Sequence, residues 1–127
     1  MIDHTGIRTL DLERAIHFYE RALAPLGYVL AKRLPGAAGF RVPAGPLRSL
    51  DPGGDFWIGR AEPHAPRQHV AFAAADRAAV DAFHAAALAA GGTDNGAPGL
   101  RPHYHAQYYA AFVLDLDGYN VEAVCHG

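Results

Sequence analysis

The 127-residue chain lacks several features that mark specialised classes of protein. No apolar run approaches the roughly 18 to 20 residues that a membrane-spanning helix needs. The only cysteine, Cys125, cannot form an internal disulfide, which fits a reducing compartment. The net charge is −2 and the arginines are scattered, so no basic stripe for nucleic acid is present. The N-terminus has neither a secretory-signal nor a transit-peptide pattern, and we expect a cytoplasmic protein without membrane or nucleic-acid partners.

The apolar content is sufficient for one folded domain. Half of the residues are apolar and 19% are charged. A chain of this length can bury a single core and still enclose a substrate-sized cavity. We therefore expect one domain over residues 1–127.

Two segments have the features of amphipathic helices. In residues 11–27, Asp11 is a good N-cap, apolar residues recur at helical spacing, and Gly27 can end the helix. Residues 76–92 repeat these features, with Asp76 as the cap and two glycines at the end. Both segments are predicted to be helical.

Short apolar runs separated by proline and glycine clusters predict strands. The polar, glycine- and proline-rich stretch 93–106 is predicted to be a loop. The predicted strands are residues 2–9, 28–34, 39–42, 55–59, 69–75, 108–115 and 119–125.

The second half of the chain repeats the first at an offset of 65 residues. Eight pairs of identical residues fall on this offset, among them His4 with His69 and Asp11 with Asp76. We infer two copies of a βαβββ unit, the first over about 1–62 and the second over about 67–127. The predicted fold class is α+β.

Three residues could form a metal site. Because strand side chains alternate, His4 and His69 are predicted to face away from the helix-covered core. Glu122 lies in an otherwise apolar strand, where an unpaired carboxylate is costly. A divalent metal bound by the two imidazoles and this carboxylate would supply the positive partner that Glu122 needs. In the alternative interpretation the histidines are ordinary strand-edge residues, and Glu122 faces solvent or pairs with Arg8 or Arg41.

The sequence resembles the vicinal oxygen chelate superfamily, which includes glyoxalases, extradiol dioxygenases and bleomycin-resistance proteins. Residues 2–28, 68–76 and 112–124 are similar to the family's first strand and helix, fifth strand and closing hairpin. The resemblance implies two βαβββ modules that form an open, cleft-lining β-barrel. It also implies that His4, His69 and Glu122 bind one divalent ion (Fe, Mn, Zn, Ni or Co).

The resemblance further implies a function and an assembly. It favours a metal-dependent enzyme acting on a small oxygen-rich metabolite or xenobiotic, by dioxygenase-like or metal-assisted lyase, isomerase or transferase chemistry. The offset of 65 places Trp57 where glyoxalase I has a fourth ligand, which argues against glyoxalase I activity. The implied assembly is a homodimer with shared clefts, in which His4 and Glu122 of one chain meet His69 of the other. The alternative is a metal-free protein that binds a small molecule in the same fold.

Other residues could line the cleft. Arg8 is predicted to bind a substrate anion or to form a salt bridge, and Trp57 to form an apolar wall or to fill the core. His103 and Tyr108 are the predicted catalytic acid or base, with solvated loop residues as the alternative. Four neighbours receive no definite role, although His126 could assist or replace a ligand: Tyr104, His105, Tyr109 and His126.

Overall fold

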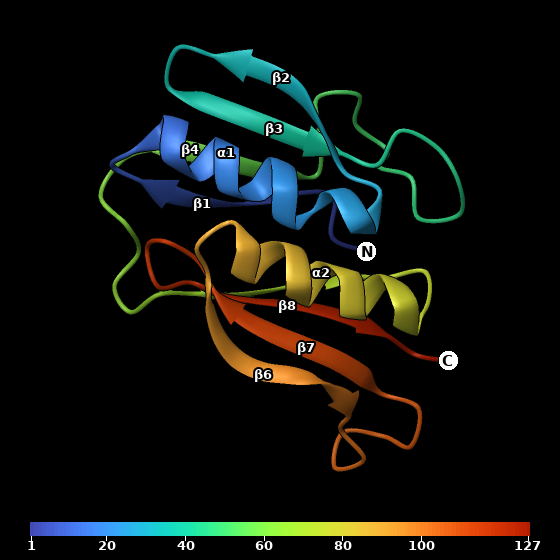
Figure 1. Cartoon of the computed structure of the whole chain (residues 1–127). Coiled ribbons are helices and arrows are strands. Elements are labelled where there is room, and N and C mark those ends of the chain that lie inside the picture. Colours follow the sequence, from blue (N-terminus) through green and yellow to red (C-terminus); the bar gives the residue numbers. More distant parts are fainter.

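The computed structural model describes residues 1–127 and contains two βαβββ halves that lie side by side (Figure 1). The first half contains β1 (Thr5–Thr9), α1 (Leu12–Ala22), the short helix η1 (Ala24–Leu26), β2 (Val29–Leu34), β3 (Ala37–Arg41) and β4 (Phe56–Arg60). The second half contains β5 (His69–Ala73), α2 (Arg77–Ala89), β6 (Thr93–Leu100), β7 (Tyr109–Leu114) and β8 (Asn120–Cys125).

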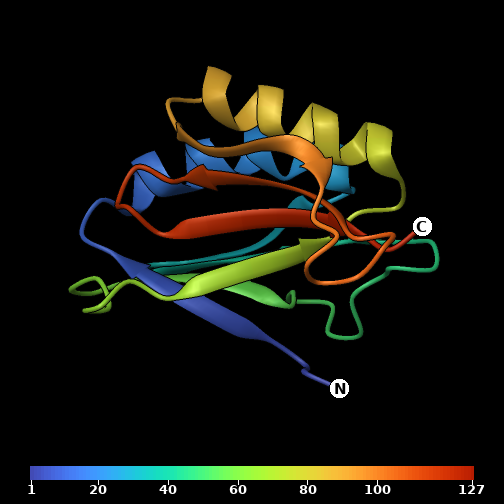
Figure 2. The same ribbon diagram turned by 90° about the horizontal axis from the view of Figure 1, so that it is seen from below.

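Each half forms a four-stranded mixed sheet. The strand orders are β1-β4-β3-β2 and β5-β8-β7-β6, and only the β1/β4 and β5/β8 pairs are parallel. Both helices cover the same side of the two sheets, and the opposite side has no helix (Figure 2). We call that uncovered side the open face. The predicted α+β fold with two βαβββ modules is confirmed, and the sheets form a cleft rather than a closed barrel.

The internal repeat is reproduced in the strand register. Gly6 lies opposite Trp57 in the first sheet, and Ala71 lies opposite Glu122 in the second. Both residues of the second pair follow those of the first by 65 positions. The offset seen in the sequence therefore matches structurally equivalent strand positions.

The predicted helix caps are confirmed. The Asp11 carboxylate accepts a hydrogen bond from Arg14 N at 3.1 Å, and the Asp76 carboxylate accepts one from Ala79 N at 2.8 Å. Gly27 ends its helical segment with φ 90°, a left-handed conformation that glycine adopts without strain.

The predicted loop over 93–106 is partly wrong. Residues Thr93–Leu100 form β6, which pairs with β7 and has register shifts on both sides of Gly96. A strand at the edge of a sheet is held through backbone hydrogen bonds along one side only, so it does not need an apolar alternation. This strand completes the second βαβββ unit.

One core joins the two halves. It comprises 25 buried residues. The centroid of the Phe72 ring in the second half lies 5.0 Å from that of Phe56 and 5.4 Å from that of Tyr28 in the first half. Two polar contacts add to the junction, because Tyr119 donates to Arg8 O at 2.7 Å and Gln68 donates to Gly6 O at 2.8 Å. These contacts fix one sheet relative to the other. None of the helices has the length and apolarity needed to cross a membrane.

Candidate functional site

A polar network lies on the open face of the second sheet. Because β5 and β8 are neighbouring parallel strands, the side chains of His69 and Glu122 meet, with Nε2 of the imidazole 2.8 Å from Oε1 of the carboxylate. The Tyr108 hydroxyl donates to Oε2 of the same carboxylate. Two residues from separate segments of the second half therefore converge on one buried carboxylate.

The backbone fixes which nitrogen of His69 faces the carboxylate. Nδ1 lies 2.9 Å from the carbonyl oxygen of Asn120, which can only accept a hydrogen bond, so Nδ1 carries a proton. Nε2 is left to face Glu122. In the chain without a metal, a proton must lie between Nε2 and the carboxylate, because both atoms are otherwise acceptors.

The carboxylate is deeply placed and its partners are polar. Glu122 is only 2% exposed, whereas His69 is exposed. Burial, followed by the hydrogen bond to Glu122 and its charge, raises the pKa of Tyr108 to about 12. The phenol is therefore protonated at neutral pH and donates its hydrogen to the carboxylate.

The donor set of this pair fits two ligands of a divalent ion. Neighbouring ligands about 2.1 Å from a metal in an octahedral site lie about 3 Å apart, close to the spacing of the Nε2 and Oε1 atoms here. A hydrogen bond from the second ring nitrogen to a backbone carbonyl is also the usual way of orienting a histidine ligand. A metal ion bound at this position would replace the bridging proton.

The structure does not bring His4 to this pair. The His4 imidazole is 61% exposed and bonds to the Asp3 carboxylate at 2.8 Å. Within the chain, no three side chains of the His, Cys, Asp and Glu types are close enough to hold a metal ion. The predicted triad is therefore present as a pair and a separate histidine.

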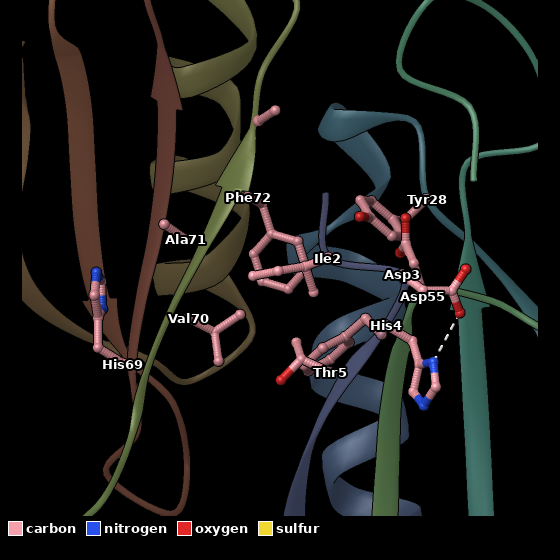
Figure 3. A pocket seen from close by; sticks show the side chains of 12 residues that line it. Ile2, Asp3, His4, Thr5, Tyr28, Asp55, His69, Val70, Ala71 and Phe72 are labelled. Atoms are coloured by element: carbon pink, nitrogen blue, oxygen red, sulfur yellow. Dashed lines mark hydrogen bonds and ion pairs between the residues drawn. The ribbon is translucent and has the colours of Figure 1, made fainter. Parts of the chain in front are cut away.

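His4 and His69 lie on opposite sides of one pocket (Figure 3). The pocket has a volume of about 370 Å³ and lies between β1 and β5, with Phe72 and Tyr28 among its apolar lining residues. The His4 ring points away from His69 in this view.

The predicted grouping of ligands between chains is wrong. That grouping separated His69 from Glu122, whereas the structure places both on adjacent strands of the same chain, in direct contact. The error arose because strand pairing was not considered: β5 and β8 are far apart in sequence but are neighbours in the sheet. The alternative pairing of Glu122 with Arg8 or Arg41 is also not observed, since neither arginine forms an ion pair.

Arg8 and Trp57 lie on the open face of the first sheet. Arg8 is exposed, and its side chain has no carboxylate partner within 4.0 Å. The half-buried Trp57 ring lies against Gly39 and Gly53, and its indole N–H donates to Gly54 O at 3.0 Å. Trp57 therefore forms an aromatic surface on the sheet rather than part of the central core.

The predicted catalytic residues have different positions. Tyr108 contacts Glu122, whereas His103 is exposed and packs on Tyr104, with 4.3 Å between ring centroids. His105 and His126 form a pair, with 2.9 Å between Nε2 and Nδ1, and both rings border Tyr108.

Tyr109 points in a different direction from these residues. Its hydroxyl donates to Asp81 of α2 at 2.7 Å, on the helix-covered side of the sheet. It therefore lies outside the polar network.

Two further residues of the network were missed by the sequence analysis. The Phe112 ring stacks on His69, with 6.2 Å between centroids, and the Arg101 guanidinium carbon lies over the Phe112 ring, 5.4 Å from its centroid. The spacing of Gly96 and Gly99 just before Arg101 was an available signal, because closely spaced glycines often mark close approach of a side chain to the backbone.

Sequence comparison identifies the family. The sequence model of the Glyoxalase/Bleomycin resistance protein/Dioxygenase superfamily matches residues 1–123, which is nearly the whole chain. The chain belongs to this superfamily. The resemblance to the vicinal oxygen chelate proteins is thereby confirmed. No curated protein matches this member of the superfamily.

Solved structures of the superfamily agree with the fold. A glyoxalase/bleomycin resistance protein from Albidiferax ferrireducens T118 is 28% identical, with 96% of this chain and 95% of that chain covered and a TM-score of 0.76. A family enzyme from Burkholderia phytofirmans PsJN is 19% identical, with 99% and 98% covered and a TM-score of 0.72. TioX from Micromonospora sp. ML1 is 18% identical, with 100% and 99% covered and a TM-score of 0.71. The last two show the fold alone.

Proposed function

We propose that this superfamily member is a metal-dependent enzyme acting on a small oxygen-rich metabolite or xenobiotic. The observation that carries the proposal is the His69–Glu122 pair, in which an oriented imidazole nitrogen lies 2.8 Å from a buried carboxylate oxygen. A charged carboxylate buried to this extent is costly unless strong partners compensate it. A divalent ion would be such a partner.

The third ligand in this proposal is His4 of a second copy. His4 is exposed and lies just before β1, two residues ahead of the open-face residue Gly6. In a homodimer whose open faces meet, His4 of one chain would complete the His69–Glu122 pair of the other. The cleft would then be shared between chains, and the 1–127 chain would act as one domain.

Residues around the pair have defined roles in the proposal. A bound Fe, Mn, Zn, Ni or Co ion would act as a Lewis acid toward neighbouring substrate oxygens. Tyr108 is protonated at neutral pH, because its pKa is about 12, so it would serve as a hydrogen-bond donor or general acid rather than as a base. Arg8 and Trp57 would bind substrate from the first sheet, and the exposed His103 would supply a second acid or base.

Metal analysis tests the proposal. Protein prepared without a His-tag or chelator, and also after addition of each candidate ion, is expected to hold about one metal per chain. His69→Ala and Glu122→Gln should each lower this to below about 0.1 equivalent. The matched variants His17→Ala and Glu62→Gln change exposed residues of the first half of the chain and should retain the metal. Wild-type protein without stoichiometric metal under all these conditions would refute the enzyme proposal.

Subunit mixing tests the shared site. His4→Ala and His69→Ala chains, allowed to exchange, should recover one metal per mixed dimer, because one of its two sites has all three ligands. His69→Ala mixed with Glu122→Ala should recover none, because those residues lie in the same chain. Recovery in the second mixture, or its absence in the first, would show that the ligands are grouped differently.

A metal-free binding protein is the second candidate. It is favoured by one observation: His69 and Tyr108 already satisfy both oxygens of Glu122. The metal analysis separates the two candidates, because a metal-free binding protein would hold no stoichiometric metal. Its ligand binding would also be insensitive to chelators.

A further inference from the structure

Arg101 is held in a fixed position at the end of β6. Its Nη1 donates to Gly99 O and its Nη2 to Ala97 O, each at 2.8 Å. The guanidinium carbon lies 5.4 Å from the centroid of the Phe112 ring, a cation–π distance. Three independent contacts therefore orient this half-buried group.

Two residues without side chains leave room beside the Arg101 guanidinium. A Cβ atom at Gly96 would lie 3.2 Å from Nη2 of Arg101 and 2.9 Å from the Phe112 ring. A Cβ atom at Gly99 would lie 3.3 Å from Nη1. Gly96 also has φ 152°, a conformation that other residues rarely adopt, and the strand register shifts on both sides of it.

Arg101 lies on the same face as the His69–Glu122 pair. Phe112, which supports the guanidinium, is the register partner of Glu122 across β7 and β8 and stacks on His69. The backbone N–H of Arg101 also donates to Tyr108 O at 2.7 Å. Arg101 is thus linked to the polar network twice, by its guanidinium through Phe112 and by its backbone through Tyr108.

The charge of Arg101 has no partner in the chain. No carboxylate lies within 4.0 Å of it, and the nearby Glu122 is bonded to His69 and Tyr108 instead. A guanidinium has more N–H donors than its two carbonyl bonds use, and a planar donor pair matches the oxygens of an oxyanion. A fixed, uncompensated cation with free donors favours an anionic ligand.

We propose that Arg101 binds the negatively charged end of the substrate, a carboxylate or a similar oxyanion, whose reactive end lies at His69 and Glu122. The substrate class is therefore a small anionic molecule with further oxygen atoms. The inference rests on the proposed function for the position of the reactive end, whereas the anion site itself needs no metal.

Calorimetric titration with mandelate and mandelamide tests the inference, because the two ligands share a hydroxyl group and a ring but only mandelate is charged. The full-length protein is titrated after chelator treatment and after loading with Zn²⁺. Wild type should prefer mandelate, and Arg101→Gln should weaken mandelate binding at least about tenfold with unchanged mandelamide binding and metal content. Arg77→Gln is the matched control, because Arg77 also lies over an aromatic ring, that of Tyr109, but on the helix-covered side.

A structural role for Arg101 predicts different results. If Arg101 served only to fasten the β6 bulge, Arg101→Gln would lower the melting temperature and leave mandelate affinity at the wild-type value. Arg101→Lys provides a second variant should the glutamine variant not fold. It keeps the charge but cannot bond two carbonyls and an oxyanion in one plane, so mandelate affinity should fall several-fold.

The outcomes separate this inference from the proposed function. Mandelate binding that depends on Arg101, in a protein that takes up no metal under any loading condition, would support the anion site and contradict the metal enzyme. Stoichiometric metal together with mandelate affinity that does not depend on Arg101 would contradict the anion site and support the metal enzyme. Absence of mandelate binding to wild type at about 10 mM would overturn the inference.

Discussion

The sheets of residues 5–60 and 69–125 have the same strand order and the same register between their parallel strands, but different side chains on their open faces. In the first sheet Trp57 lies opposite two glycines, Gly6 and Gly39, and its ring covers Gly39. In the second, Glu122 lies opposite Ala71 and Phe112 and bonds to polar side chains. The repeated backbone therefore carries an aromatic surface in one module and a polar site in the other.

The same contrast appears where the modules meet. Tyr19 and His84 are equivalent by the offset of 65 and each bonds to a carboxylate. Tyr19 is buried and reaches Asp115 of the other module, whereas His84 bonds to the exposed Asp94 of its own module. Equivalent helix positions thus serve the junction in one module and the surface in the other.

The largest expected effect follows from removing the aromatic surface of the first module. Trp57→Ala should lower the free energy of unfolding by about 2–3 kcal/mol, because the ring loses its contacts with Gly39 and Gly53 and the indole loses its bond to Gly54. Urea unfolding followed by circular dichroism measures this, with the exposed Arg60→Ala on the same strand as control. A loss below about 0.5 kcal/mol would show that the ring does not pack on the sheet.

A smaller loss is expected at the junction. Asp115 accepts hydrogen bonds from Tyr19 at 2.5 Å and from the backbone of Asp117 and Tyr119 at 2.9 Å. Asp115→Asn turns an amide N–H toward one of these donors. It should lower the free energy of unfolding, measured in urea, by about 1–3 kcal/mol. Leu50, the equivalent residue of the first module, is exposed, so Leu50→Asn should be nearly neutral. Equal losses in both variants would contradict the difference between the modules.

Alkaline pH should weaken the same junction. Burial and then the negative charge of Asp115 raise the pKa of Tyr19 well above its ordinary value. The unfolded chain therefore releases this proton at lower pH than the folded chain, and stability falls as pH rises above about 10. Wild type should lose about 1 kcal/mol more than Tyr19→Phe for each pH unit above this value. Parallel stability curves for the two proteins between pH 7 and 11 would exclude a buried Tyr19 hydroxyl.

The smallest effect is expected at the exposed pair of the second module. The hydrogen bond from His84, followed by one from the Gly96 backbone, lowers the pKa of Asp94. The associated stability is present above the ordinary aspartate pKa and is lost as pH falls below it. Asp94→Asn should therefore leave stability at pH 7 within experimental error and slightly flatten its decrease below about pH 4. A loss of stability at pH 7 as large as that of Asp115→Asn would remove the contrast between the buried Tyr19–Asp115 pair and the exposed His84–Asp94 pair.

Much of the fold could be predicted because it depends on local patterns. The caps Asp11 and Asp76, the helical stripes and most strands follow from the chemistry of neighbouring residues, and all were found where expected. β6 could not be predicted in this way, since an edge strand held by backbone bonds leaves little trace in side-chain pattern. Arg101 was missed for a related reason: its position depends on the bulged backbone of β6.

The repeat, the helix caps and the face on which each strand residue lies follow from the sequence alone, because these depend on spacing along the chain. Tertiary packing selected which of these residues meet. It placed Glu122 against His69 and Tyr108, left His4 bonded to Asp3, and set Arg101 over Phe112. Alternation along a strand fixes the direction of a side chain, but the neighbour it contacts is fixed by strand pairing between segments far apart in the sequence.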